Sequence, residues 1–145
     1  MQRANIFNPN PSGKNLGDYS VEVLVVNGEK MPIPASGSLK QTTITVVDSA
    51  RNANAVVIGQ KIGRDQSKLE FKAPFLTALE WSNILTIFEN SFINSVTYYD
   101  QQKGRKITRE MYVNDRTAEP YSIDEDGNIT VWKDCSFNLI DTGRY

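Results

Sequence analysis

The chain has 145 residues, enough for one domain with a sizeable hydrophobic core but not for two. Its 16 Lys and Arg residues nearly balance its 17 Asp and Glu residues, and this net charge of −1 argues against a protein that binds nucleic acid through its overall field. The sequence contains no histidine, which excludes Ser-His-Asp and Cys-His catalysis and histidine-ligated zinc.

Further features narrow the class of protein. No apolar run approaches the length that crosses a bilayer, and the polar N-terminus does not resemble a secretory signal, so we expect no membrane partner. The single cysteine, Cys135, excludes an internal disulfide, and its alternation with core-facing positions predicts a buried, unreactive thiol. We therefore expect a protein that is not an enzyme and has no cofactor or metal site.

Residues 1–18 are rich in Asn, Pro, Ser and Gly and have no apolar periodicity. Two interpretations stay open for them: a disordered terminus, or a flexible arm that orders on a neighbouring subunit through Ile6 and Phe7. Residues 19–145 are predicted to form a single β domain.

The first half of this domain is patterned as strands. Residues 20–26 alternate, Asn27-Gly28 favours a type I′ hairpin turn, and residues 31–33 are predicted to form a short return strand whose prolines confine it to a sheet edge. Residues 39–47 are rich in β-branched side chains and predict a longer strand.

A polar connection, residues 48–55, is predicted to interrupt the strands. Residues 56–62 resume the strand pattern, with Gly59 a candidate bulge, and residues 68–72 alternate with Leu69 and Phe71 facing inward.

One segment, residues 74–90, has a helical period. Its apolar residues recur at i, i+3, i+4 and i+7 from Trp81 to Phe88, which predicts a helix over about residues 77–90 with one apolar stripe. Thr77 and Glu80 have the spacing of a capping box, and Leu76 and Trp81 that of a hydrophobic staple. Since a lone helix of this length is marginal in water, the strands must cover its stripe.

The remaining segments predict two more hairpins. Residues 95–100 and 107–113 flank a charged tip, residues 114–120 are predicted to form a loop, and an Asp-Gly turn precedes a long strand over residues 128–140. In that strand Val131 is predicted to share the core face with Cys135, and Trp132 to lie on the opposite face. The expected fold is mainly β: an antiparallel β-sandwich or half-barrel of about eight strands with one flanking helix.

Three constellations could carry chemistry. The acidic turn at residues 124–128 lacks the spacing of a calcium-binding EF-hand loop and predicts a plain hairpin turn. Arg116 and Asp134 are predicted to form a bridge that pins the 114–120 loop to the last strand. The basic tip with Lys103 and Arg105 is predicted to be a solvated hairpin tip, because the aromatic interleaving of single-strand binders is confined to Tyr98-Tyr99.

Several short stretches together resemble one group of proteins. They are Asn27-Gly28 with Pro32, Arg51-Asn52-Ala53-Asn54, Lys68-Leu69-Glu70, Tyr99-Asp100 with Gly104, Tyr112-Val113-Asn114-Asp115-Arg116, and Trp132-Lys133-Asp134 with Phe137-Asn138-Leu139-Ile140. In their order over residues 26–141 the chain resembles short proteins encoded among the tail genes of phages and prophages of Gram-positive bacteria. The order of elements is also similar to the fold shared by phage tail-tube, distal-tail and baseplate-hub proteins. The sequence departs from the expected pattern at Ala55 and Asn114, where glycine would be typical, and in its long N-terminal extension.

This resemblance implies a structural subunit of a virion tail, assembled in the host cytoplasm, that forms a homo-oligomeric ring, commonly hexameric, around the DNA channel. Other tail proteins would be its partners, and DNA would pass through the lumen without sequence-specific binding. Contacts between subunits and rings would involve the N-terminal arm (Ile6, Phe7), the polar connection (Asp48, Arg51, Asn52, Asn54) and the basic tip (Lys103, Arg105). The structural residues would be Thr77, Glu80, Trp81, Arg116, Trp132 and Asp134.

Two alternatives stay open at this point. The first is a monomeric carbohydrate- or protein-binding β-sandwich module of a phage receptor-binding apparatus, with Tyr98, Tyr121 and Trp132 as an aromatic platform. The second is a small enzyme that uses paired carboxylates, although no such pair can be recognised from spacing alone.

Overall fold

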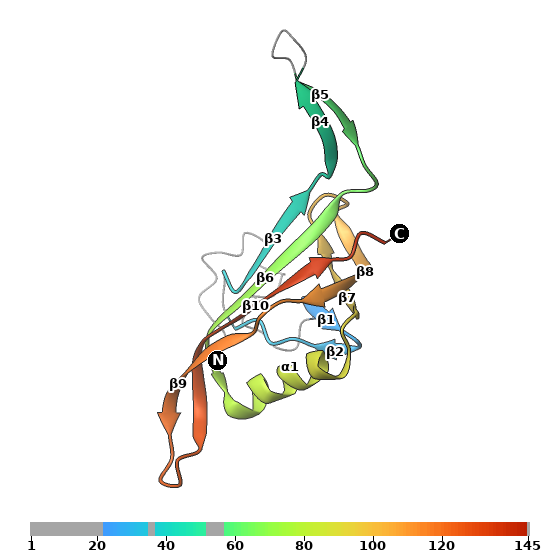
Figure 1. Ribbon diagram of the computed structural model, residues 1–145. Coiled ribbons are helices and arrows are strands. Elements are labelled where there is room, and N and C mark those ends of the chain that lie inside the picture. Colours follow the sequence, from blue (N-terminus) through green and yellow to red (C-terminus); the bar gives the residue numbers. More distant parts are fainter. Residues whose placement is uncertain (1–21, 35–36, 52–56, 145) are drawn as a thin grey trace, which may run out of the picture.

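The computed structural model describes residues 22–34, 37–51 and 57–144, with the backbone alone at residues 48–51, 57, 58 and 61. Over these residues the fold is mainly β, with an eight-stranded antiparallel sheet, a separate two-stranded hairpin and a single helix (Figure 1). The expected fold class, an antiparallel β-sandwich or half-barrel with one helix, is therefore confirmed.

The elements follow one another along the chain in a simple order. They are β1 (Leu24–Val26), β2 (Glu29–Lys30), β3 (Leu39–Ile44), β4 (Val47–Arg51), β5 (Val57–Lys61), β6 (Gln66–Thr77), α1 (Ala78–Asn90), β7 (Asn94–Asp100), β8 (Arg105–Val113), β9 (Thr117–Ile123) and β10 (Ile129–Asp141).

The large sheet has the order β2-β1-β7-β8-β10-β6-β3, and β9 pairs with the first half of β10. Although β3 and β7 are far apart in this order, side chains of β3 reach the end of β7. The Gln41 amide donates to the Tyr99 carbonyl at 2.8 Å and accepts from the Gln101 N–H at 2.7 Å. The sheet is therefore curled, with its two halves facing each other across the core.

The core is centred on Phe137 of β10. Its ring stacks on Phe71 of β6 at 4.7 Å between centroids, and it meets Phe88 of α1 edge-on at 4.9 Å. Trp81, on the same face of α1, lies 6.3 Å from it. Because aromatic side chains bury the largest apolar areas, this cluster joins the helix to the two longest strands of the sheet.

Helix α1 begins as its sequence predicts. Thr77 is the N-cap, its hydroxyl accepts from the Glu80 N–H at 3.2 Å, and the Glu80 carboxylate accepts from the Thr77 N–H at 3.0 Å. This reciprocal pair satisfies two backbone donors that a helix otherwise leaves open. Trp81, Ile84 and Phe88 are buried, so the predicted apolar stripe is the face that packs on the sheet.

The predicted type I′ turn is also confirmed. Asn27 and Gly28 have φ of 51° and 83°, the left-handed values that this turn requires at both central positions. The predicted position of the return strand is wrong, because β2 is Glu29–Lys30 and none of residues 31–33 is in a strand. Met31 and Ile33 follow β2 and are buried in the core.

The polar connection predicted at residues 48–55 is a strand over its first part. β4 pairs with β5 in an unbroken antiparallel register from Val47 opposite Lys61 to Arg51 opposite Val57. Gly59 pairs regularly with Ser49, so the predicted bulge is wrong. Backbone pairing needs no apolar side chains, which is why a polar segment can extend as a hairpin. Figure 1 shows this β4–β5 hairpin projecting from the end of β3 and the start of β6. From here on, the arm means this hairpin and not the N-terminal segment.

The predicted faces of the last strand are wrong in its first half. Cys135 faces the core as expected, but Trp132 also packs against the core. The burial pattern of β6 changes in the same way. Every second residue is buried from Ser67 to Ala73, but the next buried residue is Leu76, three positions further on. Between these positions lie Pro74, which has no N–H, and Asp134, whose φ is 52°. This local irregularity turns both strands, so the core-facing set shifts by one residue.

The loop predicted at residues 114–120 is also shorter than expected. β9 begins at Thr117 and pairs with β10 through three register shifts, and the β9–β10 hairpin projects at the end of the molecule opposite the arm (Figure 1).

Candidate functional site

The constellations tested for chemistry form no reactive centre. Among residues 22–34, 37–51 and 57–144, no group of three or more His, Cys, Asp or Glu side chains could hold a metal ion. Asp124 instead accepts from the backbone N–H groups of Asp126 and Asn128 at 2.9 Å, as in a plain hairpin turn. Cys135 is buried, and burial together with the nearby Asp134 carboxylate raises the pKa of its thiol to about 11.

The predicted bridge between Arg116 and Asp134 is wrong. Arg116 instead donates to the carbonyl of Asn114 at 3.0 Å. The connection between β8 and β9 is joined to β10 through Asn114. The Asn114 side chain accepts from the Asn138 N–H at 2.8 Å, and its backbone N–H donates to the Asn138 carbonyl at 3.2 Å. An asparagine side chain can bond to nearby backbone, which accounts for its presence where glycine was expected.

The aromatic platform considered for a binding module does not form. Tyr98 is buried and donates to Ser67 at 2.7 Å, and Trp132 packs against the core, which leaves Tyr121 as the exposed member. A flat stacking surface needs several exposed rings, so these three residues do not constitute one.

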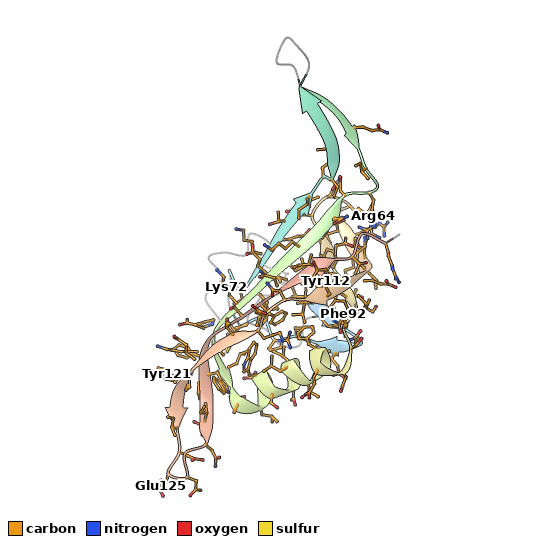
Figure 2. All side chains as sticks on the ribbon, viewed as in Figure 1. Arg64, Lys72, Phe92, Tyr112, Tyr121 and Glu125 are labelled. Carbon is orange, nitrogen blue, oxygen red and sulfur yellow. The ribbon has the colours of Figure 1, made fainter. Side chains whose placement is uncertain are left out.

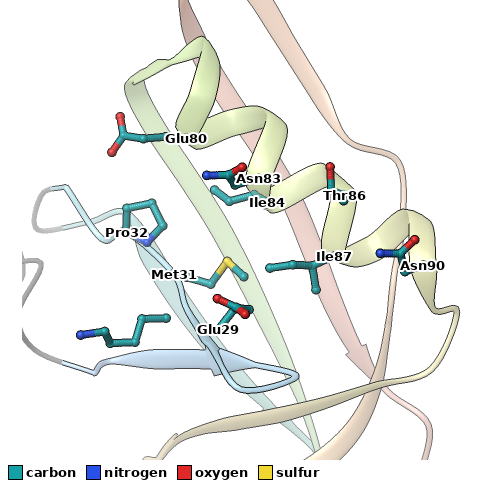
Figure 3. Close-up of a pocket in the computed structure, with 10 residues that line it drawn as sticks. Glu29, Met31, Pro32, Glu80, Asn83, Ile84, Thr86, Ile87 and Asn90 are labelled. Carbon is teal, nitrogen blue, oxygen red and sulfur yellow. The ribbon is translucent and has the colours of Figure 1, made fainter.

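A groove of about 580 Å³ lies between α1 and the segment that follows β2 (Figure 3). Buried Met31 and Ile84 line it together with polar side chains of the helix. Two of these polar groups are engaged locally, since Glu80 completes the helix cap and the Thr86 hydroxyl donates to the Ser82 carbonyl at 2.8 Å. Glu29 and Lys30 of β2 and Asn83 and Asn90 of the helix complete its polar lining.

One open pairing surface is the outer edge of β3. In the described sheet, β3 pairs with β6 on one side and with no strand on the other. The register fixes which backbone groups of β3 point outward. The Ser38 carbonyl accepts from the Lys72 N–H at 2.7 Å, so the backbone groups of every second residue from Ser38 onward bond to β6. The backbone N–H and C=O groups of Leu39, Gln41 and Thr43 consequently point away from β6.

The β4–β5 hairpin also has open edges but lies outside the large sheet, and within that sheet the edges of β2 and β9 are less suited to pairing. β2 has two residues, and β9 contains Pro120 and is interrupted by register shifts against β10. Short edges, prolines and bulges are the devices by which proteins prevent edge-to-edge association. β3 has six residues without proline or bulge, so we regard its outer edge as the candidate site of assembly.

The inner face of β3 holds this edge in place. Gln41 bonds to the Tyr99 carbonyl and the Gln101 N–H, and the Thr43 hydroxyl accepts from the Gln101 amide at 2.8 Å. Strand β3 is thus held along one edge by β6 and on its inner face by the end of β7. These contacts keep its outward backbone N–H and C=O groups in an extended geometry.

A buried ion pair fixes the base of the arm. Arg64, between β5 and β6, donates to both carboxylate oxygens of Asp141 at 2.6 and 2.7 Å. The Ser67 and Gly143 N–H groups also donate to this carboxylate. Burial alone raises the pKa of Asp141, but these hydrogen bonds outweigh it and the pKa lies below its ordinary value.

Comparison with known proteins assigns the chain to a family. A model of a family of unknown function, DUF6711, matches residues 23–142. The chain belongs to the DUF6711 family. No curated protein and no solved structure matches it. The DUF6711 region spans every described strand but leaves out residues 1–22 and 143–145.

The sequence-predicted contact residues of this DUF6711 protein fall into three groups. Lys103 and Arg105 are exposed at the tip of the β7–β8 hairpin. This tip lies beside the arm base, because Gln102 donates to Asp65 at 2.8 Å. The backbones of Asp48 and Arg51 belong to β4, whereas the four remaining predicted contacts lie outside the described residues: Ile6, Phe7, Asn52 and Asn54.

Two important groups were not predicted from the sequence. Asp141 follows Phe137 and Leu139 on the core face of β10, and a carboxylate at a core-facing position is itself a signal that a buried partner exists. Nothing local indicates that Arg64 is that partner.

Over the described part of the DUF6711 chain, no helix is long and apolar enough to cross a membrane.

Proposed function

We propose that this DUF6711 protein is a structural subunit of a phage tail, in a tail-tube, distal-tail or baseplate ring, and that its copies associate side by side around the DNA channel. The observation that carries this proposal is the unpaired, regular edge of β3, with its outward N–H and C=O groups. The protein would then act through its shape and its contacts in the assembly, not through a chemical reaction.

Pairing between sheets of adjacent copies would satisfy the outward groups of β3. Each added strand gains backbone hydrogen bonds along its length, which supplies affinity with little dependence on side chains. A neighbouring copy that contributes its own edge would extend the sheet from one subunit into the next, and repetition closes into a ring if the rotation between copies permits.

The surface charge favours one orientation of such a ring. The outer face next to β3 carries Lys40, Lys68 and Lys72, and one of these lysines, Lys40, pairs with Glu70 at 3.7 Å. Cationic side chains attract DNA phosphates in a salt-dependent way and would retard passing DNA. On the outer face of β7 and β8, the hydroxyls of Thr97 and Thr108 share a hydrogen bond at 2.8 Å. The charges of Lys106 and Glu110 on the same face balance, so it is the better lumen surface.

The proposal is tested by the mass of the assembly and its dependence on the β3 edge. Light scattering on the eluting protein should give a multiple of 16.3 kDa at high concentration, and negative-stain images should show rings or short tubes. Partner tail proteins would be expected to promote assembly.

Thr43→Pro is the decisive variant. It removes an outward N–H of β3 without removing a hydrogen bond to β6, so assembly should be lost while the monomer stays folded. Thr43→Ala is the matched control, because it removes the hydroxyl bond to Gln101 but keeps the N–H. If Thr43→Pro assembled as well as the parent, the β3 edge would not be the contact. If no rings or tubes formed at any concentration, the monomeric binding module would be favoured instead.

A further inference from the structure

We propose that the outer face of the β9–β10 end is the contact surface of a two-fold symmetric dimer, in which two copies of the chain pack back to back. The contact is closed, because each copy presents the same surface and none is left over for a third copy. It uses neither the β3 edge, nor the β7–β8 tip, nor the arm, so it does not rest on the proposed ring. Its basis is an exposed apolar patch with charges of opposite sign on either side.

The register of three strands fixes the face on which this patch lies. Phe75 of β6 pairs with Lys133 of β10, which in turn pairs with Glu119 of β9. The Lys133 ammonium lies 3.8 Å from the Glu119 carboxylate, as expected for paired residues on one face of a sheet. The neighbouring pair, Leu76 and Trp132, packs toward the core. The row that contains Phe75 therefore faces outward.

Two further apolar side chains join Phe75 on this face. The Tyr121 ring meets the Phe75 ring edge-on at 4.8 Å between centroids, and the two residues are 62% and 50% exposed. Ile123, two positions further along β9 and so on the same face as Tyr121, is 62% exposed. Clustered apolar side chains of this size are typical of a contact surface, whereas isolated ones are not. These three residues are hereafter the outer patch.

Charges of opposite sign lie on either side of the outer patch. Toward the tip, the turn of the β9–β10 hairpin carries three consecutive carboxylates, Asp124, Glu125 and Asp126. Toward the body, Lys72 is exposed on the outer face of β6, between the buried neighbours on the inner face. Figure 2 shows Lys72, Tyr121 and Glu125 in this order along one side of the molecule.

The spacing of these charges suits a two-fold axis through the outer patch. Lys72 precedes Phe75 by three residues and Asp124 follows Tyr121 by three, which is about 10 Å in each direction. Since the Phe75 and Tyr121 rings are in contact, the cation and the carboxylates lie at similar distances on opposite sides of one point. A rotation of 180° about that point brings the acidic turn of each copy over Lys72 of the other.

This self-complementarity identifies a second copy of the chain as the occupant. An isologous contact sets each outer patch against its equivalent and forms every charge pair twice. Two copies packed in parallel would instead bring the two acidic turns together, which is unfavourable. The apolar side chains would supply most of the affinity, while the exposed charges would fix the orientation and be screened by salt.

Self-cross-linking tests the contact directly. A two-fold axis brings a side chain near it close to its own equivalent, so Glu119→Cys protein treated with a short bis-maleimide should give covalent homodimers. Glu110→Cys is the matched control, because Glu110 is also a carboxylate in an exposed ion pair but lies on β8, away from the outer patch. The buried Cys135 is common to both variants. The yield should be several times higher for Glu119→Cys, and equal yields would overturn the proposal.

Tyr121→Ala tests the apolar part of the contact. It removes the central ring of the outer patch from an exposed position, so the protein should stay folded while the concentration needed for half-dimerisation rises severalfold. Tyr99→Ala is the control, since Tyr99 is 56% exposed on β7 and lies outside the patch. Light scattering over a dilution series measures both midpoints. Equal midpoints for the two variants would contradict the assigned surface.

Charge exchange tests the orientation. Lys72→Glu alone and Glu125→Lys alone should each reduce dimer yield severalfold, because each substitution acts at two equivalent places in a symmetric contact. A chain that carries both keeps its net charge of −1 and again has opposite signs on the two sides, so its yield should return. Asp124 is left unchanged because it forms the turn. Failure of the combined variant to recover would contradict the two-fold arrangement.

The Thr43→Pro variant separates this dimer from the proposed ring. With the β3 edge blocked, light scattering should give twice 16.3 kDa at high concentration, and the Glu119→Cys cross-link should persist. A folded Thr43→Pro protein that stays monomeric would overturn the dimer, whatever the parent protein forms. A parent protein that forms this dimer but no rings or tubes would leave the dimer established and remove the ring alone.

Discussion

The two ends of the molecule are held by different physical means. At the arm base, β5, β6 and the end of β10 are joined through the buried pair of Arg64 and Asp141. At the opposite end, β6 passes into a capped helix whose Trp81 and Phe88 pack on Phe137. Both arrangements position a projecting hairpin, one by charge and hydrogen bonds, the other by apolar burial.

This difference determines how each end responds to a change of conditions. An ion pair depends on the protonation of its carboxylate, whereas apolar packing does not. An unpaired buried charge is also costly, while a truncated surface contact is not. We therefore expect the arm base to be the end most sensitive to acid and to single polar substitutions.

Asp141→Asn should have the largest effect. It removes the carboxylate that faces Arg64 and leaves the guanidinium beside a neutral amide, which should lower the free energy of unfolding by about 3 kcal/mol. Denaturant titration measures this quantity. Glu110→Gln is the matched control, because Glu110 pairs with Arg144 at 3.3 Å on the exposed surface and should cost less than about 1 kcal/mol. Equal effects of the two substitutions would contradict the proposed importance of the buried pair.

Acid should weaken the arm base selectively. Because the folded-state pKa of Asp141 is lowered, its stabilisation is fully present above the unfolded-state pKa of about 3.9 and is lost as pH falls through the folded-state value. The parent protein should thus lose stability on acidification more steeply than Asp141→Asn. Urea titrations from pH 6 to pH 2 measure the difference, and parallel pH profiles would show that another carboxylate is responsible.

Thr77→Ala tests the opposite end and should have a moderate effect. It removes the hydroxyl that accepts from the Glu80 N–H, and loss of an N-cap costs about 1 kcal/mol. Thr86→Ala is the same chemical change in the middle of the same helix and should be near neutral, since the Thr86 hydroxyl bonds to the Ser82 carbonyl within the helix. A larger loss for Thr86→Ala than for Thr77→Ala would be inconsistent with capping at this end.

Asp134→Gly should have the smallest effect, and in the stabilising direction. Asp134 has φ of 52°, which glycine adopts without the steric cost of a Cβ, although glycine gains more entropy in the unfolded chain. The two terms nearly cancel, so we expect a gain of about 0.5 kcal/mol or less. Asp134→Ala should instead be destabilising, because it keeps the Cβ and loses the polar group. A stabilised Asp134→Ala protein would show that the positive φ is not strained.

The local features of this protein were determined by its sequence. The capping box of Thr77 and Glu80, the Asn27-Gly28 turn and the apolar stripe of α1 each depend on residues within a few positions of one another. Strict alternation likewise identified Leu69 and Phe71 as core residues. Such signals are short-range because backbone dihedrals and adjacent side chains create them, and the fold class followed from their order.

The tertiary structure alone decided what joins these elements. Arg64 and Asp141 are 77 residues apart, and no local pattern links them. The core-facing set of β10 depends on the irregularity at Pro74 and Asp134, which alternation on a single strand does not contain. The open edge of β3 is likewise a property of the sheet order, because a strand becomes an edge only when the positions of all other strands are fixed.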